Sequence, residues 1–279
     1  MNPGTRIYEP LSGLSGVASA GTPAISIPTN RRHMMNKVFC SAMLGAVATK
    51  NPVDIIEKVI HQIGTKTIRE EYVEDIVAWA KHNKLPSGVA DALALYYAEP
   101  PRASVNDEVI SAWDTFGLNK DFQLKFKLKA GLTTPALEIV NVYDSNQMID
   151  PVSKSRVLQI VKRNRSSYNL GTVGDIVVRE VGLPITAIYL KAAAGNTIDH
   201  VKVTVDDTQV VHDLSLDQNN SFLADYGYDP TAFSYVVRFD TERQIMRRME
   251  NIRSMVLKVT SSAAQSVDMI LEQVAPDYI

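Results

Sequence analysis

Residues 183–213, LPITAIYLKAAAGNTIDHVKVTVDDTQVVHD, decide how the rest of the sequence is interpreted. Apolar side chains among residues 185–190 form a first strand pattern. Residues 201–205 then alternate valine with polar residues, which is the period of a strand that is buried on one face. Asp206 and Asp207 interrupt the pattern as a turn before it resumes at residues 210–211. The stretch therefore predicts strands that are joined by a tight turn.

A weaker copy of this pattern lies in the first half of the chain. Residues 59–63 (VIHQI) lead to a turn at Gly64 and Thr65, and the pattern resumes at residues 67–68. Val59 aligns with Val201 at a shift of 142 residues (201 − 59), which is about half of the 279-residue chain. We therefore interpret the protein as two copies of one β domain in a single chain.

Length and composition set the broad class. A chain of 279 residues can hold two domains, each with its own core. With 45% hydrophobic and 22% charged residues it is expected to be globular, and a formal net charge of −2 does not indicate nucleic-acid binding. No apolar run is long enough to predict a transmembrane helix, and the start MNPGTRIYEP lacks the features of a secretory signal. Cys40, the single cysteine, excludes an intrachain disulfide and is predicted to be a buried, inert thiol.

Further strand patterns recur on both sides of the opening stretch. The clearest is FQLKFKLK at residues 122–129, which is apolar on one face and mostly lysine on the other. The other predicted strands cover residues 24–28, 33–44, 92–98, 136–143, 176–178, 233–239, 255–260 and 267–274. Helical patterns predict a helix over residues 70–83, a short turn over 109–113 and a polar helix over 241–253, whereas residues 216–228 are expected to be irregular.

The sequence suggests four segments: an N-terminal arm (1–23), a first domain (24–147), a basic connector (148–169) and a second domain (170–279). The arm contains many glycines and little to bury, so it is expected to be disordered or to be ordered by neighbouring subunits. About eight short strands per half without βαβ alternation predict an all-β protein of two antiparallel eight-stranded jelly rolls, a double jelly roll with short helical inserts.

The connector contains five basic residues and no acidic one between residues 153 and 167, namely Lys154, Arg156, Lys162, Arg163 and Arg165. The first interpretation is a solvated linker. The second is a subunit contact with acids such as Glu70, Glu71 and Glu74. The third is attraction to anionic lipid headgroups, which contributes about 1 kcal/mol per basic residue near such a surface.

Three stretches of the second half, residues 182–214, 222–239 and 253–274, resemble the major capsid protein of tailless, membrane-containing icosahedral phages of the corticovirus type. Residues 55–76 of the first half are similar in layout to that family's strand, turn, strand and short helix. The resemblance implies a structural protein without catalytic activity, in which two rolls stand side by side and three chains form a trimer with a six-cornered outline. Such trimers tile an icosahedral shell over an inner membrane.

The resemblance also implies the partners and the location. The partners would be further copies of the chain, neighbouring trimers, minor capsid and vertex proteins and lipids of the inner viral membrane, with no direct contact to nucleic acid. The protein would be found in the virion and, during assembly, in the host cytoplasm. A trimer of two-roll chains has six similar units, so it can sit among six neighbours by using related contacts.

The search for chemistry finds no catalytic signature. Residues 171–175 (GTVGD) lack the GK[ST] of a phosphate-binding loop, and HExxH, GxSxG and paired cysteines are absent. The histidines have no metal-ligand spacing, and His61 and His200 are predicted to lie at a surface or interface. No cofactor is expected. Asp206 and Asp207 could bind calcium, although solvated turn carboxylates are the preferred interpretation.

Two other functions fit a β protein of this kind. A duplicated jelly-roll enzyme or carbohydrate-binding protein of the bicupin type needs a His-x-His cluster with a third histidine and a glutamate, and the sequence lacks that cluster. A receptor-binding spike protein would more often contain a fibrous or repeat-rich stem. The size of the particle in solution distinguishes these alternatives from a capsid trimer.

Overall fold

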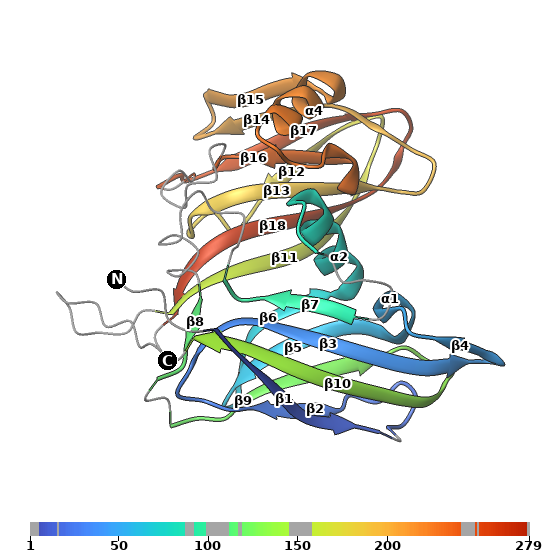
Figure 1. Cartoon of the computed structure of the whole chain (residues 1–279). Coiled ribbons are helices and arrows are strands. Elements are labelled where there is room, and N and C mark those ends of the chain that lie inside the picture. Colours follow the sequence, from blue (N-terminus) through green and yellow to red (C-terminus); the bar gives the residue numbers. More distant parts are fainter. Residues whose placement is uncertain are drawn as a thin grey trace.

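The computed structural model describes residues 6–15, 17–86, 92–98, 112–116, 119–144, 158–240, 249 and 251–277. Two β-sandwiches lie side by side, and helix α2 (Val73–His82) lies between them (Figure 1). All strand pairs within the four sheets are antiparallel.

The first roll contains two sheets. In one sheet the strand order is β1 (Arg6–Leu14), β10 (Leu132–Asp144), β3 (Arg32–Leu44) and β4 (Val47–Thr49), and β7 (Ala92–Tyr96) and β8 (Trp113–Asp114) also pair with β3. In the other sheet the order is β2 (Ala24–Ile27), β9 (Phe122–Leu128), β5 (Ile56–Ile63) and β6 (Lys66–Tyr72). The short helix α1 (Pro52–Ile55) precedes β5, and α2 follows β6 directly.

The second roll repeats this arrangement. One sheet has the order β11 (Leu158–Leu170), β18 (Gln265–Asp277), β13 (Ile185–Ala192) and β16 (Tyr235–Arg238). The other has the order β12 (Val173–Val178), β17 (Met255–Ser261), β14 (Ile198–Val205) and β15 (Gln209–Ser215). Helix α4 (Leu216–Asp225) follows β15, and the 3-10 turn η1 (Pro230–Ala232) precedes β16.

Corresponding strands occupy the same places in both rolls. The sheet β1-β10-β3-β7 corresponds to β11-β18-β13-β16, and β2-β9-β5-β6 corresponds to β12-β17-β14-β15. Strands β5 and β14 begin at Ile56 and Ile198, a shift of 142 residues (198 − 56), as the sequence predicted. The double jelly roll is therefore confirmed.

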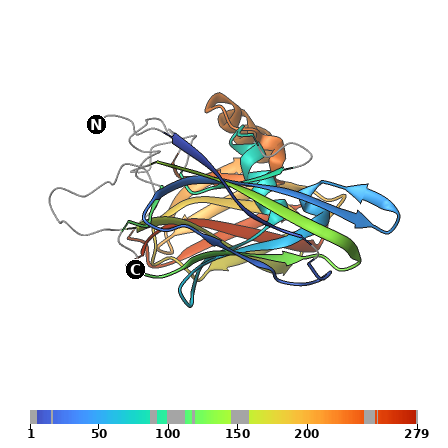
Figure 2. The same cartoon turned by 60° about the horizontal axis from the view of Figure 1, so that its bottom comes forward.

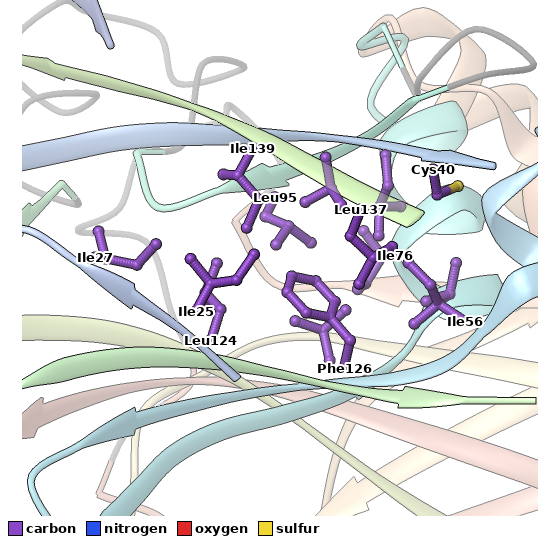
Figure 3. Close-up of a cluster of buried hydrophobic side chains, with 14 of the residues drawn as sticks. Ile25, Ile27, Cys40, Ile56, Ile76, Leu95, Leu124, Phe126, Leu137 and Ile139 are labelled. Atoms are coloured by element: carbon purple, nitrogen blue, oxygen red, sulfur yellow. The ribbon is translucent and has the colours of Figure 1, made fainter. Parts of the chain in front are cut away.

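The first core forms because strands with a two-residue period turn one apolar face inward. Phe122, Leu124 and Phe126 of β9 are fully buried, and Figure 3 shows Leu124 and Phe126 in the same cluster as Leu137 and Ile139 of β10. Each such side chain stabilises the fold by roughly 1.5–3 kcal/mol. The lysines between them point to the other face.

The second core follows the same rule, and a tight turn organises its edge. Val201, Val203 and Val205 of β14 are buried in it. Asp206 and Asp207 then adopt positive φ angles of 49° and 64°, which aspartate tolerates in turns better than most residues do.

The segment that was predicted as an N-terminal arm contains a strand of the first roll. Residues of β1 pair with β10 from Arg6↔Asp144 to Leu14↔Leu137, with one irregularity after Leu11. The expectation that this segment is disordered or ordered by neighbours is therefore wrong for β1. Exposed and half-exposed residues alternate along β1, so its apolar signal in the sequence is weak.

The predicted basic connector likewise contains a strand. Strand β11 pairs with β18 without interruption from Leu158↔Asp277 to Leu170↔Gln265. Arg163 and Arg165 face outward from the second core and pair there with acids of the first roll, so the outer face of the strand is charged and not apolar. The prediction of a linker over residues 158–169 is therefore wrong.

Other predicted elements also differ. Residues 216–225 were expected to be irregular, but they form α4, which begins with a capping box between Ser215 and Gln218. The predicted helix over 241–253 lies outside the described residues except for 249 and 251–253, which are not helical. Of the predicted helical turn over 109–113, only Ala112 and Trp113 are described, and Trp113 begins β8.

Candidate functional site: the contact between the two rolls

Helix α2 belongs to the first roll by sequence but packs on the outer face of the second. Glu74 and Asp75 lie in its first turn and Lys81 and His82 in its last, which complements the helix dipole. Its residues Trp79 and Ala80 share one apolar cluster with Tyr189 of β13 and Ile270 of β18. The cluster joins side chains from both rolls, so it acts as a third core between them.

A buried ion network surrounds Trp79. The Arg163 guanidinium of β11 donates to Glu71 Oε1 of β6 at 2.8 Å and to Glu272 Oε2 of β18 at 2.9 Å. It also lies over the Trp79 ring, 3.9 Å from its centroid. The ion pair between Arg69 and Glu71 (2.7 Å) extends the network into the first roll.

Glu272 is the centre of this network. Its carboxylate is almost fully buried and accepts hydrogen bonds from Trp79 Nε1 at 2.7 Å, Thr186 Oγ1 at 2.8 Å and Tyr189 OH at 3.2 Å. A buried carboxylate is tolerated only when donors of this kind replace water. Burial, together with the negative charge of Glu272, raises the pKa of Tyr189 well above its usual value.

A second set of ion pairs lies at the rim of the contact. Arg165 donates to Glu74 Oε1 at 2.7 Å and to Asp75 Oδ2 at 3.1 Å, and it also pairs with Asp268. Lys191 Nζ donates to the same two acids of α2, at 3.1 and 2.8 Å. The hydrogen bond from Arg165 lowers the pKa of Glu74, whereas burial raises the pKa of Asp75.

The end of α2 is fixed by His82. Its ring stacks on Tyr228, with centroids 4.9 Å apart and planes 1° apart, and its Nδ1 lies 2.8 Å from the carbonyl oxygen of Asp229. The Asp229 backbone N–H donates to the His82 carbonyl at 2.7 Å. Burial, and secondly the nearby Arg238 charge, lower the pKa of His82 to about 3.

The basic residues that were singled out in the sequence fall into three groups. Arg163 and Arg165 form ion pairs at the contact between the rolls, and their contact with lipid stays an untested prediction. Lys162 lies half-buried on β11. Lys154 and Arg156 lie outside the described residues. Among the suggested acidic partners, Glu71 and Glu74 do pair with these arginines, but within one chain.

The proposed calcium ligands have a structural role. Asp206 Oδ1 accepts from the backbone N–H of Arg253 at 2.7 Å and of Ser254 at 3.2 Å, and these bonds lower the pKa of Asp206. Asp207 Oδ1 accepts from Ser254 Oγ at 3.0 Å. Within the described residues no three His, Cys, Asp or Glu side chains gather to hold a metal ion, and calcium binding stays an untested prediction.

The histidines are mostly internal. His61 was predicted to lie at a surface or interface, but it is fully buried, with its ring 5.4 Å from that of Trp113 and 5.5 Å from that of Tyr97. Its strand β5 lies between β9 and β6, and His61 shares the buried face of that strand with Val59 and Ile63. His200 is partly exposed and pairs with Asp213 at 3.0 Å.

Two shallow clefts follow the seam between the rolls. They measure about 320 and 230 Å³, and Tyr72 and Arg165 line both.

No helix in the described part of the chain is long and apolar enough to cross a membrane. The apolar cluster and the two sets of ion pairs therefore hold two similar bodies together.

Comparisons with known proteins agree with this geometry. A family model described as "Viral coat protein P2 N-terminal domain" matches residues 8–144, and one described as "Viral coat protein P2 C-terminal domain" matches residues 162–276. A search of curated protein sequences finds no match.

Several solved structures share the fold. The major capsid protein P2 from bacteriophage PM2 is 20% identical with a TM-score of 0.79, and the match covers 98% of both chains. A chain from the structure of Sulfolobus Turreted Icosahedral Virus is 10% identical with a TM-score of 0.69 and covers 99% of this chain and 92% of that one. A chain of the PBCV-1 virus capsid is 10% identical with a TM-score of 0.67, covering 99% and 97%.

Proposed function

The chain belongs to the viral coat protein P2 family and is a major capsid protein of a PM2-like virus, and from this premise we propose that it forms homotrimers that tile an icosahedral shell around an inner membrane. As a coat protein it is structural and not an enzyme. Neighbouring trimers and minor capsid and vertex proteins would be its further partners in the virion.

The repeated strand order of the two rolls is the observation that carries the trimer. Three chains with two equivalent rolls each give a ring of six similar bodies, and such a ring can contact six neighbours through related surfaces. The packing of α2 on the second roll supports this proposal, because it fixes the two rolls as one rigid unit.

The mass of the particle in solution tests the trimer. A chain of 30.8 kDa should elute as a species of about 92 kDa (three times 30.8) in size-exclusion chromatography with light scattering. A monomer at micromolar concentration would contradict the proposal. A monomer that retains a bound metal ion would favour the bicupin alternative.

Contact with the inner membrane is a separate proposal that concerns the basic residues before β11. Lys154 and Arg156 are the residues to test, because Arg163 and Arg165 are engaged between the rolls. Flotation of purified trimers with liposomes should depend on anionic lipid and should fall in K154Q/R156Q. The matched control is K125Q/K127Q, which removes two charges from β9 of the first roll. Equal flotation with neutral and anionic liposomes would contradict this contact.

A further inference from the structure

Helix α4 is the counterpart of α2, but its exposed side lacks a partner within the chain as described. Both helices have ten residues, and both follow a seven-residue strand directly. A shift of 143 residues (216 − 73) relates them, so Phe222 of α4 corresponds to Trp79 of α2. Trp79 is 3% exposed at the contact between the rolls, whereas Phe222 is 54% exposed.

The sheets on which these helices would dock correspond in the same way. In the second roll Ile188 pairs with Leu271, and in the first roll Val38 pairs with Ile139, and all four face a core. One residue further along, Tyr189 is on the outer face under α2. Phe39 takes the corresponding outer position and is 36% exposed.

Charged residues of the existing contact have apolar counterparts at these open surfaces. Arg163 pairs in register with Glu272, and their counterparts in the first roll are Pro10 and Val140. Glu71 pairs in register with Val59, whereas Leu214 takes its place opposite Val201. An arginine between two glutamates is thus replaced by proline, valine and leucine. In the opposite sense, apolar Ile270 corresponds to Glu138, which pairs in register with Phe39.

Several of the exposed large apolar side chains lie on the same two surfaces. Among the described residues, Tyr8 of β1 and Phe39 of β3 lie on the outer face of one sheet of the first roll, whereas Leu44 and Val47 lie at the β3–β4 hairpin on its other face. Val210, Phe222 and Tyr226 lie on or next to β15 and α4. Apolar groups gathered in this way are typical of surfaces that other subunits cover.

Figure 1 shows α4 at the end of the molecule that is far from the first roll, and Figure 2 shows α2 (teal) and α4 (orange) on the same side of the molecule. Within the described residues, a chain therefore presents an exposed helix at one end and a partly exposed sheet face at the other. Such a head-to-tail contact closes into a ring when its rotation fits the number of subunits.

We propose that α4, with Phe222 at its centre, docks on the outer face of β3 and β10 around Phe39 in a second copy of this chain, and so repeats between subunits the docking of α2 within one. This inference rests on the proposed homotrimer and names the two surfaces that join its subunits. Three such contacts close the ring, and each replaces the internal ion network by apolar packing.

Single substitutions test whether these two surfaces, and not other exposed surfaces, form the contact between subunits. F222D and F39D should each shift the mass in light scattering from about 92 kDa toward the 30.8 kDa of one chain. V177D is the matched control, because Val177 on β12 is 55% exposed outside both surfaces, and it should stay trimeric. Unchanged circular dichroism and melting temperature in the monomers would exclude unfolding as the cause.

A disulfide identifies the contact directly. Two differently tagged chains with Cys40→Ala, one with F39C and the other with F222C, are co-expressed and oxidised. A disulfide between the two tags, without disulfides between equal tags, supports the proposal, whereas equal-tag disulfides or none would overturn it. If the unsubstituted protein is trimeric and F222D stays trimeric, this contact is wrong and the trimer stands; if the unsubstituted protein is monomeric, the trimer itself is wrong.

Discussion

Arg163 shows how a basic residue becomes part of a buried contact. Its guanidinium meets a carboxylate from each roll and the face of Trp79, so its charge is compensated where water is excluded. A planar guanidinium suits two carboxylates and a ring at the same time, which a lysine ammonium does not. The residue therefore links the two rolls, together with the apolar cluster around Trp79.

Removing Arg163 should destabilise the protein strongly. R163M leaves Glu272 and Glu71 buried with a lost partner, and we expect the free energy of unfolding to fall by about 3–5 kcal/mol. Adding Glu272→Gln should recover part of the loss, because one uncompensated charge is then gone. Urea unfolding followed by the fluorescence of Trp79 and Trp113 measures both effects.

A surface ion pair is the control for this experiment. Lys127 pairs with Glu57 at 2.8 Å, but its side chain is 47% exposed. K127A should therefore change the free energy of unfolding by less than about 1 kcal/mol. An equal decrease of the free energy of unfolding in R163M and K127A would show that the buried network stabilises the protein no more than a surface ion pair does.

Buried histidines should make the protein sensitive to acid. His33 lies between Asn141 Oδ1 (3.2 Å) and Thr115 Oγ1 (3.1 Å), and burial lowers its pKa from 6.5 to about 4. The unfolded chain takes up a proton below about pH 6.5, while the folded one stays neutral down to about pH 4. The contribution of neutral His33 to the free energy of unfolding is therefore fully present above pH 6.5. It is lost as the pH falls to about 4, and this loss is roughly 3 kcal/mol.

His33→Asn tests this dependence, since asparagine does not titrate. Between pH 7 and pH 5 the free energy of unfolding should fall by about 2 kcal/mol less in H33N than in the unsubstituted protein. His200→Gln, at an exposed position, is the control for replacing a histidine. The same pH slope in H33N and in the unsubstituted protein would contradict the expectation.

The sequence limits what could be known of single residues. It shows Arg163 and Arg165 as a basic run, but their partners Glu71, Glu74 and Glu272 come from other strands and from a helix, some 90 to 109 residues away in the chain. Such a network cannot be predicted from the sequence, because its members are far apart in the chain. His61 was missed for a different reason: it shares the buried face of β5 with Val59 and Ile63, but a polar histidine was expected at a surface.

At the level of elements, strands with a clear two-residue period were predictable and polar ones were not. The apolar faces of β9 and β14 are visible in the sequence as a two-residue alternation, and both strands are present with nearly the expected bounds. The strands β1 and β11 were missed, because β1 is little buried and the outer face of β11 is covered by charged partners. Helix α4 was missed for its polar composition, although Ser215 and Gln218 give the spacing of a capping box.

The cap of α4 should contribute measurably to stability. The Ser215 hydroxyl accepts from the Gln218 backbone N–H at 3.4 Å, and the Gln218 side chain accepts from the Ser215 N–H at 3.0 Å. S215A should lower the free energy of unfolding by about 1 kcal/mol, whereas S215D should keep most of it, because aspartate also caps helices. Urea unfolding of both variants measures this, and equal values for S215A and S215D would contradict a capping role.

Strand β1 should be required for the first roll. Deleting residues 1–14 removes its pairing with β10 and leaves the β10 edge open, and open edges favour aggregation. We therefore expect low soluble yield and an early melting transition. A truncated chain that stays soluble and melts as the full chain does would show that β1 is only an appendage.

At the scale of the whole molecule, duplication explains both the fold and its use. Each roll has its own core, and the contact between them uses a third cluster and an ion network rather than shared strands. The two bodies could therefore diverge in sequence while their strand order stayed the same. Of the two corresponding helices, α2 docks within the chain, which leaves α4 for the proposed contact with a neighbour.

The strength of the internal contact can be tested by cutting the chain. A site-specific protease sequence inserted after residue 150 allows the purified protein to be cleaved into two halves, each containing one roll. The halves should stay together in size-exclusion chromatography at pH 7, because Trp79 and the pairs of Arg163 are buried between them. With R163M the cleaved halves should separate at a lower urea concentration than the unsubstituted ones, whereas K127A should leave that concentration unchanged. Halves that separate immediately after cleavage would show that only the covalent link holds the rolls together, and the rigid two-roll unit that underlies the proposed trimer would have to be abandoned.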